Sequence, residues 1–339
     1  MPVSNTEIGA HSFTPWREAV SILPPELEER LERLGPDVLA ALEEIRLRVG
    51  QPLELCGQTG SAFLHSVSGT TSIVADGVIV TSAHIKHVLA QITQFSMYAV
   101  EEELRRGFIT IPGGHRVGVA GHVVTDSSGQ VKSIRAIASL NIRVAHAFPG
   151  VATRLRNALY RKQDGRPYSV LIISPPQCGK TTLVRDIARQ WSENKLVRRT
   201  VPAKVAIVDE RSEIAGCIEG VPQFAVGPRT DVLDGCPKAQ GMLMAIRSLS
   251  PDIVVTDEIG RSEDVTAILE ATHAGVSVIT TAHGLRVEDW RMRPNMETLF
   301  QSKAFDRYIL LSRRRGPGTI EAVLDEAGKP IGFGGGPSC

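Results

Sequence analysis

The sequence predicts an α/β protein with two parts: a smaller α+β N-terminal domain, then a domain whose mostly parallel central sheet is flanked by helices. In the second half, apolar runs rich in β-branched residues alternate with helix-like stretches, the pattern of a parallel sheet covered on both faces. In the first half, a half-buried strand pattern and a hairpin signal stand among amphipathic helices. A length of 339 residues allows two separate cores.

The domain boundaries follow from changes in composition along the chain. Residues 1–20 show no periodicity and the C-terminal GFGGGPSC is glycine-rich, as is typical of disordered ends. The helix-like run VATRLRNALY lies between two turn signals. We therefore expect a loose N-terminal arm over 1–24, an α+β domain over 25–150, a linker helix region over 151–167, the α/β domain over 168–328 and a disordered tail over 329–339.

The α+β domain is expected to begin with two helices and a strand. PPELEERLERLG places three leucines at helical spacing, and a second helix is expected over Asp37–Leu42. Apolar residues alternate with arginines from Ile45 to Val49, which predicts a half-buried strand. The amphipathic stretch Thr81–Arg106 predicts a third helix. FITIPGGHRVGVAGHVV then predicts a hairpin, and VKSIRAIASLNIRVAHAF contains two short strand-like runs.

The α/β domain is expected to alternate strands with helices. Its continuous apolar runs predict strands over 169–174, 204–209, 252–257 and 275–283, and the segments between them predict helices over 180–193, 238–249 and 262–272.

Composition places few limits on partners. Lysine and arginine number 38 against 37 acidic residues, so bulk charge gives no case for a nucleic-acid partner.

Five scattered cysteines without a C-x-x-C pair predict free thiols and no zinc site. The run RRRG (Arg313–Gly316) is typical of a solvated face. The sequence carries no signal-peptide or membrane-spanning pattern, so we expect a cytoplasmic protein that reaches a membrane through partners.

A phosphate-binding loop is predicted where a buried strand meets the next helix. LIISPPQCGKTTLVRD carries G-K-T at the helix start, which points backbone N–H groups and the positive helix end at an anion. Lys180 is expected to reach the β- and γ-phosphates of ATP, and the Thr181 hydroxyl to coordinate Mg²⁺. Ser174 replaces the usual first glycine, and Pro175 and Pro176 have no N–H. The donors to phosphate are therefore expected at Gln177, Cys178, Gly179, Lys180, Thr181 and Thr182.

Three more strand ends carry polar residues suited to hydrolysis. In DIVVTDEIG, Asp257 is expected to hold Mg²⁺ and Glu258 to orient the attacking water, unless both acids only cap the next helix. In KVAIVDERSEI, Asp209, Glu210 and Glu213 are expected to reach the same crevice, because ligands of open α/β sheets bind at the carboxyl ends of strands. The alternative for these three acids is a solvated loop. His283, at the end of VSVITTAH, either senses the γ-phosphate or is structural.

In this order, the four motifs resemble those of the hexameric secretion-type ATPases of type II and type IV secretion and of twitching motility. GKT is similar to their Walker A motif, VDERSE to the Asp box, DEIG to Walker B and TAHG to the His box. Within that group, ISPPQCGKTTLVRDIAR and DEIGRSEDVTAILEATHAGVSVITTAHG are most similar to the family of stage III sporulation protein AA of endospore-forming bacteria. The resemblance covers roughly residues 25–325.

The resemblance implies a RecA-like P-loop ATPase, with ATP and Mg²⁺ as nucleotide and cofactor, that energises or assembles a channel between mother cell and forespore. It implies a homo-oligomeric, hexameric ring docked on membrane proteins of that channel. It also implies arginines of the N-terminal domain that reach the nucleotide of the same or the next subunit. Arg135 and Arg143 are the candidates and Arg116 is a weaker one, each with a surface salt bridge as the alternative.

Two other interpretations stay open. One is a nucleic-acid-associated ATPase built on the same core. The other is a nucleotide-binding scaffold that hydrolyses weakly, which the altered loop keeps open.

Overall fold

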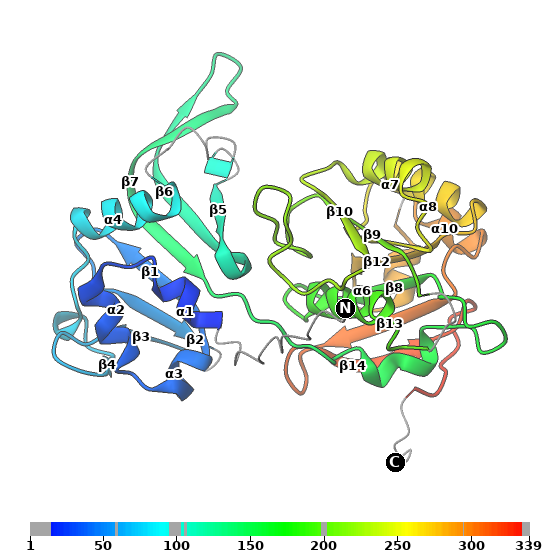
Figure 1. Ribbon diagram of the computed structural model, residues 1–339, viewed down its shortest axis with the longest axis horizontal. Helices are drawn as coiled ribbons and strands as arrows, with labels where there is room; N and C mark the ends of the chain where they lie inside the picture. Colours follow the sequence, from blue (N-terminus) through cyan, green and yellow to red (C-terminus); the bar gives the residue numbers. More distant parts are fainter. Residues whose placement is uncertain are drawn as a thin grey trace, which may run out of the picture. The chain divides into compact units, whose positions relative to one another are not determined.

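The computed structural model describes residues 15–57, 60–94, 103–104, 107–197, 202–293 and 295–333. The chain forms two compact units, Met1–His146 and Ala147–Cys339 (Figure 1). The first is an α+β unit and the second an α/β unit, so the predicted fold class is confirmed.

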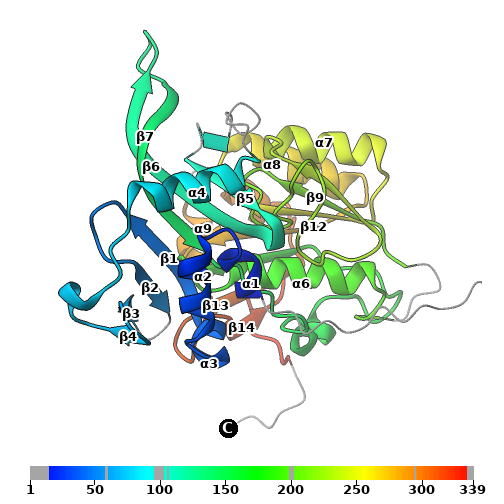
Figure 2. The same ribbon diagram turned by 60° about the vertical axis from the view of Figure 1, so that its left-hand side comes forward.

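In the described residues, the first unit contains one antiparallel sheet, in the order β4-β3-β2-β1-β7-β6-β5. The long hairpin of β6 and β7 extends beyond the rest of the sheet (Figure 2). The strands are β1 (Leu42–Arg48), β2 (Glu54–Gly57), β3 (Gly60–Leu64), β4 (Thr70–Thr71), β5 (Phe108–Ile111), β6 (His115–Thr125) and β7 (Val131–Arg143).

Short helices pack against this sheet. Apolar side chains such as Leu27, Ile45, Ile85 and Ile142 form a single core cluster, in which alternate residues of each strand face the helices. The helices are α1 (Pro15–Val20), α2 (Pro25–Glu32), α3 (Pro36–Ala40) and α4 (Ser82–Ile92), with the 3₁₀ turns η1 (Val74–Asp76) and η2 (Pro112–Gly114).

Three predictions for this unit need correction. Residues 15–24 belong to the fold rather than to a loose arm, because Trp16 of α1 and Leu23 just after it are buried in the core; residues 1–14 lie outside the described part. In the helix expected over Thr81–Arg106, α4 ends at Ile92 and residues 103–104 are again helical, while 95–102 and 105–106 lie outside the described residues. The two expected strand-like runs are one strand, β7, interrupted by a positive φ of 46° at Ala136.

The last residues of the first unit are held by its own side chains and backbone. Val144 N–H donates to the Glu43 carbonyl at 2.8 Å. Ala145 N–H donates to Nδ1 of the buried His115 at 2.9 Å, and His146 Nε2 lies 2.9 Å from the Leu42 carbonyl oxygen. The chain is therefore anchored to the first unit up to residue 146.

In the second unit the sheet order is β10-β9-β11-β12-β8-β13-β14. The strands are parallel from β10 to β13, and β14 is antiparallel. The sequence patterns missed β10, β13 and β14. The strands are β8 (Val170–Ser174), β9 (Val205–Asp209), β10 (Thr230–Asp234), β11 (Ile253–Glu258), β12 (Ser277–His283), β13 (Arg307–Ser312) and β14 (Thr319–Leu324).

Helices cover both faces of this sheet (Figures 1 and 2). One face packs on α6 (Lys180–Ser192) and the 3₁₀ turn η3 (Thr153–Ala158). The other packs on α7 (Lys238–Ser248), α8 (Ser262–His273), α9 (Val287–Arg291) and α10 (Glu297–Gln301). Because strand residues alternate between the faces, Ile172 joins the first core and Leu171 the second. Among the described residues, no helix has both the length and the hydropathy to cross a membrane.

Two expectations for this unit also change. The linker region forms the 3₁₀ turn η3 instead of an α-helix over VATRLRNALY. In the expected tail, Ile331 N–H donates to the Val323 carbonyl at 2.8 Å and its side chain packs on the core. Residues 334–339 lie outside the described residues.

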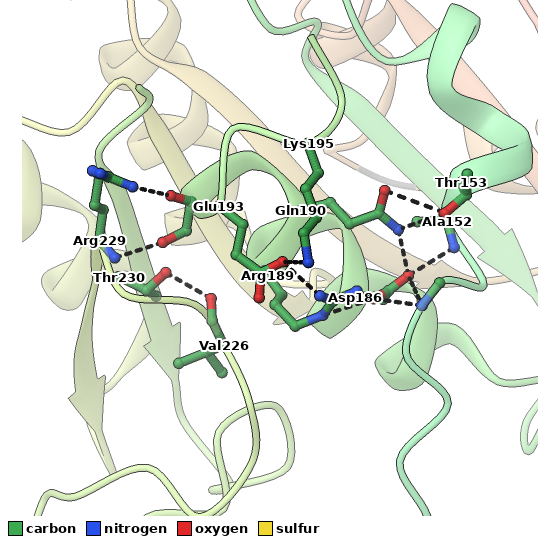
Figure 3. Close-up of polar contacts among 12 residues, drawn as sticks. Ala152, Thr153, Asp186, Arg189, Gln190, Glu193, Lys195, Val226, Arg229 and Thr230 are labelled. Carbon is green, nitrogen blue, oxygen red and sulfur yellow. Dashed lines mark hydrogen bonds and ion pairs between the residues drawn. The ribbon is translucent and has the colours of Figure 1, made fainter. Parts of the chain in front are cut away.

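A buried carboxylate on α6 holds the beginning of the second unit (Figure 3). Asp186 accepts hydrogen bonds from the N–H groups of Gly150 at 3.0 Å and Ala152 at 2.8 Å. Gln190 Nε2 donates to it at 2.7 Å, and Arg189 forms an ion pair with it. The polar face of α6 thus serves as the attachment point of the incoming chain.

Candidate active site

The loop between β8 and α6 has the geometry of an anion-binding turn. Gly179 is the N-cap of α6 with φ of 85°, and a Cβ there would lie 3.2 Å from the Gly318 nitrogen, so glycine suits this position. Gln177 also has a positive φ, of 58°. Ser174, in the place of the usual glycine, is a buried strand residue that pairs with His283 in register. It does not adopt a positive φ, so its position needs no glycine.

The Lys180 ammonium lies inside this loop. Its Nζ donates to the carbonyl oxygens of Ser174 and Pro175, both at 3.1 Å, and lies 3.3 Å from the Ser174 hydroxyl. Burial lowers the pKa of Lys180, while the nearby Glu258 acts to raise it. The carbonyl oxygens of Ser174 and Pro175, at the front of the loop, therefore bind the lysine.

Strand order brings the predicted His283 between Lys180 and Glu258. Its strand, β12, lies between β8 and β11. His283 Nδ1 is 3.0 Å from Lys180 Nζ, and its Nε2 is 2.7 Å from Glu258 Oε2. Because an ammonium only donates and a carboxylate only accepts, these contacts fit the tautomer with hydrogen on Nε2. The first residue of α6 and the last residues of β11 and β12, all three predicted site residues, thus form one continuous chain of contacts.

A second cluster forms around Lys238, the first residue of α7. Its Nζ is 2.8 Å from Asp257 Oδ1 and 3.3 Å from Glu210 Oε2, and it donates to the Glu258 carbonyl. Burial raises the pKa of Asp257 to about 6, although Lys238 works in the opposite direction. Burial acts to lower the pKa of Lys238, but Asp257 and Glu210 outweigh it and raise that pKa.

Asp209 ends β9 as expected, but its carboxylate binds the backbone of the following loop. It is fully buried and accepts hydrogen bonds from the N–H groups of Glu213, Ile214 and Ala215 at 2.8–2.9 Å. Burial raises its pKa. Asp209 therefore shapes the loop after β9, and its neighbour Glu210 joins the Lys238 cluster.

The residue types fit Mg²⁺. Thr181, on the first turn of α6, and Asp257, at the end of β11, offer the hard oxygen donors that this ion prefers. Mg²⁺ is usually held by one or two protein oxygens, with phosphates and waters completing the shell. Thr181 and Thr182 are half-buried, and the N–H groups of this first turn have no partner within the helix.

The arginine candidates lie in the first unit. Arg135 is exposed on β7, opposite His122 of β6. Arg143, the last residue of β7, is 62% exposed, and its Nε lies 3.9 Å from Glu44 Oε1. The Arg116 guanidinium lies 4.5 Å from the centre of the Phe108 ring. A role for any of them at a nucleotide stays a prediction.

Sequence reasoning missed two contributors. Lys238 matches no motif, and its one signal is a cation at a helix N-terminus, where the helix dipole disfavours it. The arginines of RRRG are exposed, as expected of a solvated face, but the β13–β14 turn that carries them also contacts the loop, because Gly318 N–H donates to the Cys178 carbonyl at 2.9 Å. In the same turn, Arg313 Nη1 donates to Gln177 Oε1 at 3.1 Å. The turn therefore supports the rear of the loop.

Solved structures share this fold. The chain superposes on the Legionella pneumophila ATPase DotB with a TM-score of 0.50 and 16% identity, covering 91% of this chain and 78% of that one. It superposes on the pilus retraction motor PilT with bound ADP with a TM-score of 0.52 and 15% identity, covering 84% and 76%. At these identities the likeness shows a secretion-ATPase fold and no more.

The sequence comparisons are more specific. The profile described as "Sporulation stage III, protein AA" matches residues 17–331. Stage III sporulation protein AA of Bacillus subtilis (strain 168) is 46% identical over 314 residues, which span 93% of this chain and 96% of that protein. The predicted resemblance is confirmed: the chain belongs to the family of stage III sporulation protein AA.

Proposed function

We propose that this protein is an ATP-hydrolysing, secretion-type motor that energises or assembles a channel complex between mother cell and forespore. The observation that carries the proposal is the continuous contact from Lys180 through His283 to Glu258. It links a loop suited to phosphate with a carboxylate suited to activating water. The fold and the family support the same assignment.

Each residue of the site then has a chemical task. The N–H groups from Gln177 to Thr182 and the Lys180 ammonium bind the phosphates of ATP. Thr181 and Asp257 hold Mg²⁺, which supplies charge neutralisation at the phosphates. Glu258, about two-fifths exposed, orients and polarises the attacking water. His283 donates a hydrogen bond from Nε2 to Glu258 and accepts one at Nδ1 from the Lys180 ammonium. A movement of that ammonium toward phosphate would therefore change the contacts of His283.

The motor also requires an assembly. We expect a homo-oligomeric, hexameric ring, attached peripherally to the mother-cell membrane through membrane proteins of the channel. Arg135 and Arg143 are the residues proposed to reach a nucleotide of the same or a neighbouring subunit. Light scattering with and without Mg²⁺–ATP tests the ring, because a persistent monomer under both conditions would contradict it.

Replacing Lys180 with Ala is expected to weaken ATP binding about 10- to 150-fold, the loss of one charged hydrogen bond worth about 1.5–3 kcal/mol. Fluorescent ATP-analogue titrations and Mg²⁺-dependent phosphate release measure the effect. Lys204→Ala is the matched control, because Lys204 is exposed just before β9, which begins at Val205.

Three outcomes would oppose the motor. No Mg²⁺-dependent turnover by the wild type, with binding retained, would favour a scaffold. Equal affinity in the Lys180 and Lys204 variants would remove the phosphate loop from the proposal. DNA or RNA binding with a steep salt dependence would favour the nucleic-acid-associated alternative.

A further inference from the structure

Lys238 brings together carboxylates from two strand ends. It begins α7, and its side chain is 10% exposed. Its ammonium lies 2.8 Å from Asp257 Oδ1 at the end of β11 and 3.3 Å from Glu210 Oε2 just after β9. It also donates to the backbone carbonyl of Glu258. One cation therefore touches both residues of the proposed Walker B pair and the proposed Asp-box glutamate.

The helix itself gives no reason for a lysine here. An ammonium at a helix N-terminus is opposed by the dipole of α7. Burial of a long charged side chain also costs hydration and rotamer freedom. What offsets these costs is the pair Asp257 and Glu210, which without a cation would be two like charges in a poorly hydrated position. The position of Lys238 is thus explained by the carboxylates and not by α7.

We propose that Lys238 is a positioning residue that occupies the cation position at Asp257 and exchanges with Mg²⁺ there. The inference rests on the proposed function, because it takes Asp257 as a magnesium-holding residue. An ammonium and a divalent ion repel strongly at the short range over which both would approach one carboxylate. Binding of Mg²⁺ with nucleotide therefore releases Lys238 from Asp257.

Release of Lys238 has a structural consequence within the second unit. The Glu258 carbonyl loses its side-chain donor, and Lys238 no longer links the first turn of α7 to the carboxylates at the ends of β9 and β11. Binding of the metal ion thereby changes the contacts of the first turn of α7, a helix that packs against α8 through its buried face.

The first test is Lys238→Met, which removes the charge and keeps an unbranched side chain. Fluorescent-ADP titrations at increasing Mg²⁺ give the half-saturating Mg²⁺ concentration, which we expect to fall about tenfold, within the usual range of coupling between sites. An unchanged or higher half-saturating concentration would overturn the exchange. Lys204→Met, which changes an exposed lysine outside the site, is the control.

The second test uses the wild-type chain and so does not depend on how a variant folds. Lysine acetylation by acetic anhydride, read by peptide mass spectrometry, is expected to increase at Lys238 when Mg²⁺ and ADP are added, with Lys204 unchanged. Equal or lower labelling of Lys238 would overturn the proposal. If the wild type binds Mg²⁺–ADP normally while both tests fail, only the exchange is wrong. If it binds no Mg²⁺–ADP, the proposed function fails with it.

Discussion

Replacing Glu258 with Gln is expected to lower ATP turnover about 10²- to 10⁴-fold, the usual contribution of a general base, while nucleotide affinity stays nearly unchanged. The amide oxygen of Gln still accepts the hydrogen bond that His283 Nε2 donates to Glu258 at 2.7 Å. The Glu258 backbone carbonyl, which accepts from Lys238, is untouched. The substitution therefore removes the negative charge and little else.

Single-turnover hydrolysis together with fluorescent-ATP binding separates the two effects. Glu263→Gln is the matched control, because Glu263 lies five residues further on, exposed in the first turn of α8. Turnover within a few fold of wild type in the Glu258 variant would remove the water-orienting role. Combined with intact binding, that result would favour the scaffold interpretation.

Replacing Asp186 with Ala is expected to reduce the free energy of unfolding by about 3–5 kcal/mol, the usual effect of removing one partner of a buried ion pair. Asp186 is 3% exposed and accepts the N–H groups of Gly150 and Ala152. Its loss leaves these donors unsatisfied and the buried Arg189 without its closest acid. Urea unfolding followed by tryptophan fluorescence reports the change, because Trp191 lies on the same helix.

Glu193→Ala is the matched control, because Glu193 pairs with the same arginine at 2.7 Å but is more exposed. We expect Glu193→Ala to reduce the free energy of unfolding by about 0–1 kcal/mol. An equal loss of unfolding free energy in the two variants would show that the buried contacts of Asp186 contribute no more to stability than the more exposed ion pair of Glu193.

The pH dependence of stability offers a further check on Asp186. Burial alone would raise the pKa of Asp186, but the N–H groups of Ala152 and Gly150, with Arg189 and Gln190, outweigh it and lower the pKa below 3.8. A lowered carboxyl pKa contributes stability above its unfolded value, and this stability is lost as pH falls through the folded value. The difference between wild type and Asp186→Ala should therefore be constant above about pH 5 and shrink below pH 3.8.

The sequence predicted the parts of the site that are written in short local patterns. Lys180, Asp257 and His283 each follow an apolar β-branched run, and such runs form buried parallel strands whose carboxyl ends share one edge. The meeting of His283 with Lys180 and Glu258 needed the strand order, because β12 lies between β8 and β11 only through long-range pairing. Their catalytic roles stay predictions.

The remaining features depend on distant partners or on weaker patterns. Lys238 is placed by acids that precede it by 28 and follow it by 19 positions, at Glu210 and Asp257. None of the β10, β13 and β14 strands, which are five or six residues long, alternates regularly between buried and exposed positions. The region of α1 does carry a local signal, which the interpretation of residues 1–20 as aperiodic overlooked: Trp16, Ala19 and Val20 of the helix and Leu23 just after it recur at helical spacing, and all are buried.

The anchored residues His146 and Gly150 set the length of the connecting segment between the two units. His146 is tied to the Leu42 carbonyl, and Gly150 to Asp186 on the helix that begins at Lys180. The chain crosses from one anchor to the other in four peptide steps, which span at most roughly 14 Å when fully extended. Whatever movements the units make, these two points stay within that reach. Only three residues, 147–149, lie between the two anchors.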